Sequence, residues 1–250
     1  PIYYFYASYK KDDDENYTIK SLLNYAITNY EIGDYDLSIA VINKIKSTYP
    51  SYENEILDEL LSENYFMTND YSRIIEYLNA RDSNLRFLDI GTGSGEFIKT
   101  IKYNFPKLNI TCSDISKAYL EVAKKKLKKF TDINFKNCKG EDLPFENESF
   151  DIINSVYLFH EVPSAIRSKI FSEISRVLKK DGVFILTDSL QLGDNYILDP
   201  LLEFFPYSTH EPYYAKYIRE DLVNNAEKFG LKMYYSKNAY LSKTLAFKKI

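Results

Sequence analysis

A glycine-rich turn that follows an apolar segment constrains the fold of this chain more than any other feature of its sequence. Residues 87–97 read FLDIGTGSGEF, so an apolar run ends near Ile90 and glycines then occupy alternate positions. Glycine permits backbone angles, and a close approach of a ligand to the backbone, that any side chain would block. The segment therefore predicts a strand, a ligand-binding turn and a helix, the opening unit of a doubly wound α/β domain.

Short apolar runs alternate with helical patterns from Leu85 onward. The expected strands cover residues 85–90, 109–113, 133–137, 150–156 and 182–188. This alternation is typical of parallel βαβ units. Two later runs, 231–240 and 243–248, follow each other closely enough to form an antiparallel hairpin. We therefore predict an α/β fold with a doubly wound, mostly parallel seven-stranded sheet that ends in this C-terminal hairpin.

The first third of the chain has apolar residues at three- and four-residue spacings, which predicts a small all-α region. Within it, residues 19–52 resemble one tetratricopeptide unit. Small Ala26 and Ser38 would let two helices approach, Gly33 would allow the turn between them, and Pro50 would end the second helix. One such unit cannot bury its own apolar face, so we expect it to pack on other helices or on the following domain.

Composition indicates a soluble globular protein that does not bind nucleic acid. The 250 residues are 45% hydrophobic and 27% charged, and a net charge of −4 gives no overall positive field to attract phosphate backbones. Neither a membrane-length apolar run nor a signal-peptide pattern occurs, so we expect a cytoplasmic protein without a membrane span. Cys112 and Cys138 stand in apolar runs without metal-ligand spacing, which predicts buried, reduced thiols and no metal site.

The spacing of the glycines distinguishes between nucleotide cofactors. A nicotinamide-binding turn would read G-x-G-x-x-G, but Glu96 stands where its third glycine would be. The tighter G-x-G-x-G spacing, with Asp89 at the strand end, suits a cofactor that has amino and carboxylate groups in place of a pyrophosphate. Asp114 ends the next strand, where a carboxylate can accept hydrogen bonds from both ribose hydroxyls. Asp114 could also be the N-cap of the following helix.

Four segments together resemble one known family. They are FLDIGTGSGEF, TCSDIS, GEDLPFENESFDII and RVLKKDGVFIL, and they follow one another in the family order and spacing. On these motifs, residues 85–250 resemble the Rossmann-like S-adenosylmethionine (SAM)-dependent methyltransferases, and most of all the small-molecule methyltransferases of ubiquinone/menaquinone biosynthesis. The resemblance implies a SAM-binding methyltransferase domain at 81–250, preceded at 1–80 by a helical region that serves as a cap or a repeat-like recruiter.

The resemblance also implies which residues hold the cofactor. The methionine end of SAM would lie against Asp89, Gly91 and Gly93, the ribose against Asp114, and the adenine against Gly140 and Glu141, with Ile115 and Tyr157 completing the set. At one position the chain departs from the family pattern, which commonly has Asp or Asn where Lys139 stands. Because lysine has no acceptor, contacts to the adenine amino group must come from the backbone near Gly140, or from Glu141 or Asp142.

Candidate catalytic residues follow from the position of the ligand crevice, beyond the carboxyl ends of the strands. The histidines of the chain, His160 and His210, both fall in segments expected at this edge, and each precedes a glutamate. Each could remove a proton from a hydroxyl or phenol, or could be a wall of the pocket. Residues 190–218 form an aromatic insertion in which Tyr213 and Tyr214 could line the acceptor pocket or simply pack.

These features favour methyl transfer to a small organic acceptor, at oxygen or another heteroatom. One alternative is a peptide or protein methyltransferase that recruits its substrate through the helical region 1–80. Another is a SAM-binding module without catalysis. Methylation of adenine in nucleic acid is disfavoured, because residues 155–158 read SVYL where such enzymes carry an N-P-P-[YF]-like element. The motifs distinguish neither the acceptor nor the oligomeric state.

Overall fold

A computed structural model describes residues 15–32, 34–50, 85–105, 107–209, 211–239 and 241–250 of the chain. Contacts between Cα atoms divide the chain into two compact units, Pro1–Ala80 and Arg81–Ile250. The second unit contains the glycine-rich turn and the other segments that resemble a methyltransferase.

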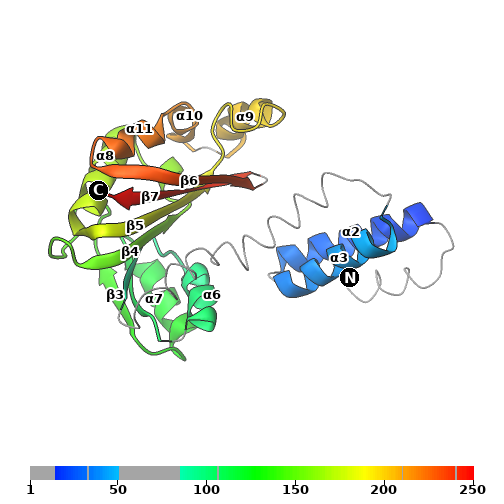
Figure 1. The fold of residues 1–250 in the computed structure, drawn as a ribbon, viewed down its shortest axis with the longest axis horizontal. Coiled ribbons are helices and arrows are strands. Elements are labelled where there is room, and N and C mark those ends of the chain that lie inside the picture. Colours follow the sequence, from blue (N-terminus) through cyan, green and yellow to red (C-terminus); the bar gives the residue numbers. More distant parts are fainter. Residues whose placement is uncertain (1–14, 33, 51–84, 106, 210, 240) are drawn as a thin grey trace. The chain divides into compact units, whose positions relative to one another are not determined.

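The described part of the first unit is a pair of helices, α2 (Glu15–Glu31) and α3 (Tyr35–Thr48), drawn in blue in Figure 1. They share an apolar core made of Ile19, Leu22, Leu23, Ala26, Val41, Ile42 and Ile45. Ser38 Oγ donates a hydrogen bond to the carbonyl oxygen of Ala26 at 2.8 Å, and both residues are fully buried. The small residues therefore stand where the two helices approach most closely. Gly33 lies outside the described residues.

The second unit is built on a seven-stranded sheet with the order β3-β2-β1-β4-β5-β7-β6. Its strands are β1 (Arg86–Ile90), β2 (Asn109–Asp114), β3 (Ile133–Asn137), β4 (Phe150–Val156), β5 (Leu178–Ser189), β6 (Leu231–Ala239) and β7 (Ser242–Lys249). Neighbouring strands among β1 to β5 pair in parallel, and β7 pairs antiparallel with both β5 and β6. The expected fold, a mostly parallel sheet with a C-terminal antiparallel hairpin, is confirmed.

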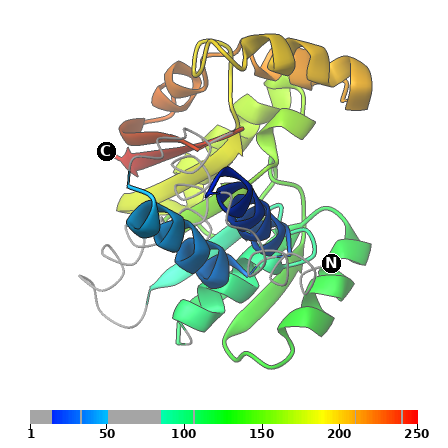
Figure 2. The same cartoon turned by 90° about the vertical axis from the view of Figure 1, so that its right-hand side faces the viewer.

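Helices cover both faces of the sheet. They are α6 (Glu96–Asn104), α7 (Lys117–Leu127), α8 (Ser164–Val177), α9 (Asp199–Thr209), α10 (Tyr214–Tyr217), α11 (Leu222–Glu227) and the 3₁₀ turn η1 (Phe159–Glu161). In the sheet, β2 and β3 are added on one side of β1, whereas β4 and β5 are added on the other side. Because crossovers between parallel strands are right-handed, α6 and α7 lie on one face of the sheet and α8 lies on the other. Figure 2 shows α9 and α10, yellow to orange, along the top of the sheet beside the hairpin strands.

Burial explains the position of α7, and strand pairing explains where β5 begins. In α7, Leu120, Ala123 and Leu127 are buried and form an inward stripe, whereas Lys124 and Lys125 are exposed on the solvated face. β5 begins at Leu178, four residues before the expected start, because Leu178 pairs with Phe150 before the register shifts. Gly182 lies within this irregular stretch, and an added Cβ there would lie 2.8 Å from the backbone oxygen of Lys179, so the irregular strand requires glycine.

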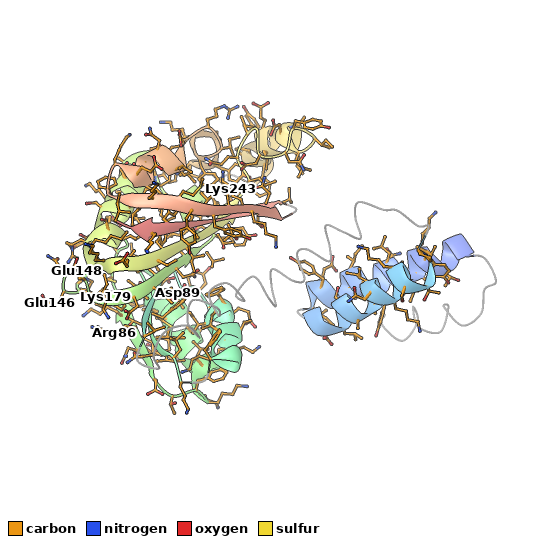
Figure 3. All side chains as sticks on the ribbon, viewed as in Figure 1. Arg86, Asp89, Glu146, Glu148, Lys179 and Lys243 are labelled. Carbon is orange, nitrogen blue, oxygen red and sulfur yellow. The ribbon has the colours of Figure 1, made fainter. Side chains whose placement is uncertain are left out.

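The strand order places the ligand crevice. It reverses between β1 and β4, and in such sheets ligands bind at the carboxyl ends of the strands beside this switch point. In Figure 3, Arg86 and Lys179 lie near the starts of β1 and β5, on the side of the sheet where these parallel strands begin. Asp89 lies nearer the opposite side, where the strands end. Thus the glycine-rich turn after β1 and the residues after β4 and β5 share the carboxyl edge.

Candidate active site

The glycine-rich turn leaves β1 with its backbone in the left-handed region. Gly91 has φ +78° and Gly93 has φ +56°, conformations that residues with side chains rarely adopt. The N–H groups of Gly91 and Thr92 donate to the carbonyl oxygen of Ser113 at 2.9 and 3.0 Å, which fixes the turn against the end of β2. An added Cβ at Gly93 would meet no atom within 4 Å, so this glycine is required for its backbone angle and not for lack of space.

Asp114, at the end of β2, is bonded to the same turn. Its Oδ2 accepts a hydrogen bond from Gly93 N at 2.8 Å, and its Oδ1 accepts one from Ser116 N at 2.7 Å. The alternative role as helix N-cap is wrong, because Ser116 caps α7 by accepting from Tyr119 N at 3.3 Å. Asp114 therefore stands two residues too early to cap the helix, and its carboxylate connects the glycine-rich turn to the end of β2.

Asp89 is a buried carboxyl group at the floor of the turn. Its Oδ1 accepts a hydrogen bond from Asn154 Nδ2 at 2.8 Å, an interaction between neighbouring strands in which the two residues face each other. Burial raises the pKa of Asp89 to about 6, although hydrogen bonds with Asn154 and Thr92 oppose the shift. No local pattern predicts the role of Asn154, since 65 positions separate it from Asp89 and only the strand register brings them together.

A first cavity of about 500 Å³ opens over this turn, within the range of small-molecule sites. Its lining includes every residue that we expected to contact the cofactor, namely Asp89, Gly91, Gly93, Asp114, Ile115, Gly140, Glu141 and Tyr157. Lys139, which departs from the family pattern, also lines it, as does Glu161. Segments at the ends of four strands, β1 to β4, therefore surround one space.

His160 lies in η1, directly after β4, and is held by an aspartate at the end of β5. His160 Nδ1 donates to Asp188 Oδ1 at 2.6 Å. Asp188 in turn accepts backbone hydrogen bonds from Phe159 N and Ser189 N, both at 2.7 Å. Because the carboxylate occupies Nδ1, a neutral imidazole keeps its free lone pair on Nε2.

The electrostatic surroundings of His160 raise its pKa. Burial lowers the pKa of this imidazole, but the hydrogen bond and charge of Asp188 and the charges of Glu211 and Glu161 outweigh that effect. Glu211 Oε2 lies 3.6 Å from His160 Nε2, is buried and makes no hydrogen bond with the described residues. His160 therefore stands between two carboxylates, one hydrogen-bonded to it and one within reach of a shared ligand.

A second cavity of about 250 Å³ adjoins His160. Its walls combine apolar and polar side chains, namely Tyr157, His160, Ser189, Leu201, Leu202, Phe205, Glu211, Tyr214 and Leu241. Tyr157 lines both cavities, with φ +51° and with its hydroxyl bonded to that of Ser242 at the start of β7. The hydroxyl groups of Tyr214 and Ser189 are 2.5 Å apart, which fixes α10 against the end of β5.

The structure brings together some of the expected catalytic residues. His160 and Tyr214 line the second cavity. Tyr213 precedes α10, is 37% exposed and lines neither cavity. His210 lies outside the described residues. The sequence reasoning missed Asp188 and Glu211, although Asp188 ends a strand at the expected edge and each histidine is followed by a glutamate.

The described part of the chain contains neither a candidate metal site nor a candidate membrane-spanning helix. Within it, no group of three or more His, Cys, Asp or Glu side chains is arranged to hold a metal ion. No helix in that part of the chain is both long and apolar enough to cross a membrane. Cys112 is buried and Cys138 is half-buried, and both are free thiols.

The sheet order, the glycine-rich turn at the switch point and the acidic residue at the end of β2 define the Rossmann-like class of nucleotide-binding enzymes. The cavity over the turn fits SAM, because open glycine backbone and a carboxylate line it together. A family model described as "Methyltransferase domain" matches residues 88–186. The protein is therefore a SAM-dependent methyltransferase, and SAM is its cofactor.

Individual relatives agree with this class. The chain is 28% identical over 175 residues to a ubiquinone/menaquinone biosynthesis C-methyltransferase of Rickettsia massiliae, covering 66% of this chain and 67% of the relative. A putative sarcosine dimethylglycine methyltransferase from Galdieria sulphuraria has the same fold, with TM-score 0.58, 17% identity, and coverage of 79% and 91%. So does the geranyl diphosphate C-methyltransferase of Streptomyces coelicolor, with TM-score 0.59, 10% identity, and coverage of 79% and 84%.

Proposed function

We propose that the protein transfers the methyl group of SAM to a small organic acceptor, at an oxygen or another heteroatom that carries a dissociable proton. The observation that carries the proposal is the position of His160, whose free Nε2 lies beside the second cavity. Tyr157 lines both cavities. An acceptor in the second cavity would then lie next to a cofactor in the first.

The first cavity supplies the groups that would hold SAM. Gly91 and Gly93 expose backbone to the methionine end, and Asp114 keeps carboxylate lone pairs available for the ribose hydroxyls although it already accepts two backbone hydrogen bonds. Gly140 lies closely against Ile90 and Ile170, where a Cβ would approach to 3.2 Å. Adenine contacts would come from this stretch of backbone and from Glu141, since Lys139 offers no acceptor.

His160 would act as the general base. The bound cofactor supplies an electrophilic methyl group on a sulfonium, so the remaining task of the protein is to align the acceptor and remove its proton. Asp188 orients the imidazole and stabilises its protonated form through the Nδ1 hydrogen bond. The apolar walls formed by Leu201, Leu202 and Leu241 would exclude water from the reaction.

The names of the relatives indicate different acceptors. Two are C-methyltransferases, one of them acting on geranyl diphosphate, and the third is named for amino-acid derivatives. A diphosphate fits this site poorly, because no Lys or Arg is among the described residues that line the second cavity. The histidine base favours a heteroatom acceptor. Product analysis would distinguish methylation at a heteroatom from methylation at carbon.

The test is an acceptor screen with isotopically labelled SAM, followed by mass-spectrometric location of the methyl group. The proposal requires a small molecule with a labelled methyl on oxygen, nitrogen or sulfur. Methylation at carbon would contradict the heteroatom assignment, and methylation of peptides alone would favour the recruiter hypothesis for residues 1–80. A protein that binds SAM but methylates nothing, in the screen or in cell extract, would favour a binding module.

The helical unit is assigned a separate role. Because contacts divide the chain between Ala80 and Arg81, we propose that residues 1–80 act as a cap or recruiter and that residues 81–250 bind SAM. The segment 190–218, with α9 and α10, would be the aromatic lid over the acceptor. A cytoplasmic location completes the proposal.

A further inference from the structure

We propose that the acceptor is an amine, and that Glu211 binds its nitrogen in the second cavity. This inference rests on the proposed function and deepens it, since it names the chemical class of the acceptor. Three independent features of the cavity support it: its charge, its unpaired hydrogen-bond acceptor and its aromatic walls.

The charge of the cavity favours a cation. Asp188 and Glu211 flank His160, so the cluster is doubly negative when the imidazole is neutral, the form that can accept a proton. None of the described residues lining the cavity is a lysine or arginine. Buried charge is costly unless it is paired, so a bound ammonium would stabilise this cluster. A carboxylate or phosphate acceptor would instead add negative charge to it.

The unpaired acceptor is Glu211 Oε2. This oxygen is buried and makes no hydrogen bond with the described residues, and it lies 3.6 Å from His160 Nε2. That separation is too long for a hydrogen bond. A buried carboxylate oxygen in this position calls for a donor from the ligand. An ammonium can donate one N–H to Glu211 and another to His160 Nε2, whereas a hydroxyl has a single hydrogen for both.

Aromatic rings form the rest of a cation site. Tyr157, Phe205 and Tyr214 all line the second cavity, and the rings of Phe205 and Tyr214 lie 4.9 Å apart between centroids. The His160 ring meets those of Tyr157 and Tyr214 edge-on, at centroid distances of 6.1 and 5.9 Å. Aromatic faces attract ammonium groups, and a carboxylate beside them is a common complement. Leucines on the remaining walls suit an apolar body attached to the nitrogen.

The chemistry is balanced with the groups present. His160 Nε2 accepts a proton from the ammonium, which frees the nitrogen lone pair. That lone pair forms the N–C bond while the C–S bond breaks and its electron pair stays on sulfur. The positive charge of the sulfonium is thereby transferred to the methylated nitrogen, and the protonated His160 returns its proton to solvent after product leaves.

The binding test uses three probes of nearly equal shape: benzylamine, benzyl alcohol and benzoate. Each is titrated into the full-length protein saturated with S-adenosylhomocysteine, and binding is followed by calorimetry. We expect benzylamine to bind at least about tenfold more tightly than benzyl alcohol, because only the amine pairs with Glu211, and we expect benzoate not to bind. Glu211→Gln should remove the preference for the amine, and Glu211→Asp should retain most of it.

A matched control separates this effect from general loss of charge. Glu203→Gln removes an exposed glutamate of α9 that pairs with Arg219 and does not line the cavity, so amine affinity should stay unchanged. Thermal unfolding verifies that each variant is folded. Equal affinity for amine and alcohol, no effect of Glu211→Gln, or failure of benzylamine, phenethylamine and butylamine alike to bind would overturn the inference.

Product analysis distinguishes the failure of the inference from that of the proposed function. Transfer of a labelled methyl group to the nitrogen of an amine that binds supports both. Transfer only to hydroxyl acceptors leaves the proposed function standing and rejects the amine. Methylation of peptides alone, with no small molecule bound, rejects both.

Discussion

The carboxylate of Asp114 accepts a hydrogen bond from the backbone N–H of Gly93 at 2.8 Å, so the acidic residue at the end of β2 holds the glycine-rich turn at the end of β1. The residues expected at the methionine end and at the ribose of SAM are thus joined by a hydrogen bond. A change in the carboxylate would disturb both the ribose contact and the turn that faces the methionine end.

Replacing Asp114 should weaken cofactor binding. Asp114→Ala removes charged hydrogen bonds to the ribose, so we expect a loss of about 1–3 kcal/mol in the free energy of binding S-adenosylhomocysteine. Calorimetry measures this loss directly. Glu146→Ala, which changes an exposed carboxylate outside both cavities, is the control. Unchanged affinity in a folded Asp114→Ala protein would remove Asp114 from the site.

Replacing Asp89 should stabilise the protein without its cofactor. Burial raises the pKa of Asp89 from 3.8 to about 6, so the ionised form destabilises the fold above that pH. A shift of this size corresponds to about 3 kcal/mol, so Asp89→Asn should gain about 1–3 kcal/mol of unfolding free energy at pH 8. The gain should shrink as pH falls through 6 and vanish below 3.8, where both states are protonated. Urea unfolding across pH measures it, and a gain that does not depend on pH would contradict the assignment.

Replacing His160 should slow methyl transfer more than it weakens cofactor binding. His160→Gln removes the base, so we expect turnover of a heteroatom acceptor to fall by about 10²–10⁴ while affinity for S-adenosylhomocysteine changes little. His210→Gln is the matched variant for the other histidine. A comparable fall in turnover would place His210 in the reaction as well, whereas unchanged turnover in both variants would reject a histidine base.

The raised pKa of His160 should also appear in the stability of the protein. Pairing with Asp188 raises this pKa above its unfolded value near 6.5, so the stabilisation is complete below that value. It is lost as pH rises through the pKa of the folded state. The difference in unfolding free energy between wild type and His160→Gln should therefore be largest in mild acid and decline on the alkaline side. A difference that grows with pH would show that burial, not Asp188, dominates.

Removing the helical unit should leave the cofactor site in place. A shortened chain that begins at Tyr71 retains the whole compact unit from Arg81, so we expect it to fold and to bind S-adenosylhomocysteine with nearly the affinity of the full chain. Calorimetry on the two proteins compares them. A folded but non-binding shortened chain would show that residues before Tyr71 contribute to the site. Loss of transfer alone would support a role in acceptor binding.

Local sequence was sufficient to predict the architecture and the cofactor cavity. The predicted bounds of β3 and β4 match the structure to the residue. The central strand β4 is mostly buried and has a largely apolar segment. The edge strand β3 instead alternates half-buried Ile133 and Phe135 with exposed polar residues, which is the pattern of a half-buried strand. The glycine spacing and Asp114 are also local signals, since the turn and the strand end require those residue types themselves. The residues expected to contact SAM therefore line one cavity.

The acceptor side of the site depended on tertiary structure. His160 and Asp188 are 28 positions apart, and Glu211 approaches His160 only because the segment after β5 returns to the carboxyl ends of the strands. Tyr213 and Tyr214 are adjacent in sequence, yet the first is partly exposed and the second lines the cavity, since consecutive side chains at the start of α10 point in different directions. Sequence thus determined which strands form and which turn lines the first cavity. The fold alone decided which acids, rings and histidine meet, because those contacts depend on strand order and helix orientation that no local pattern encodes.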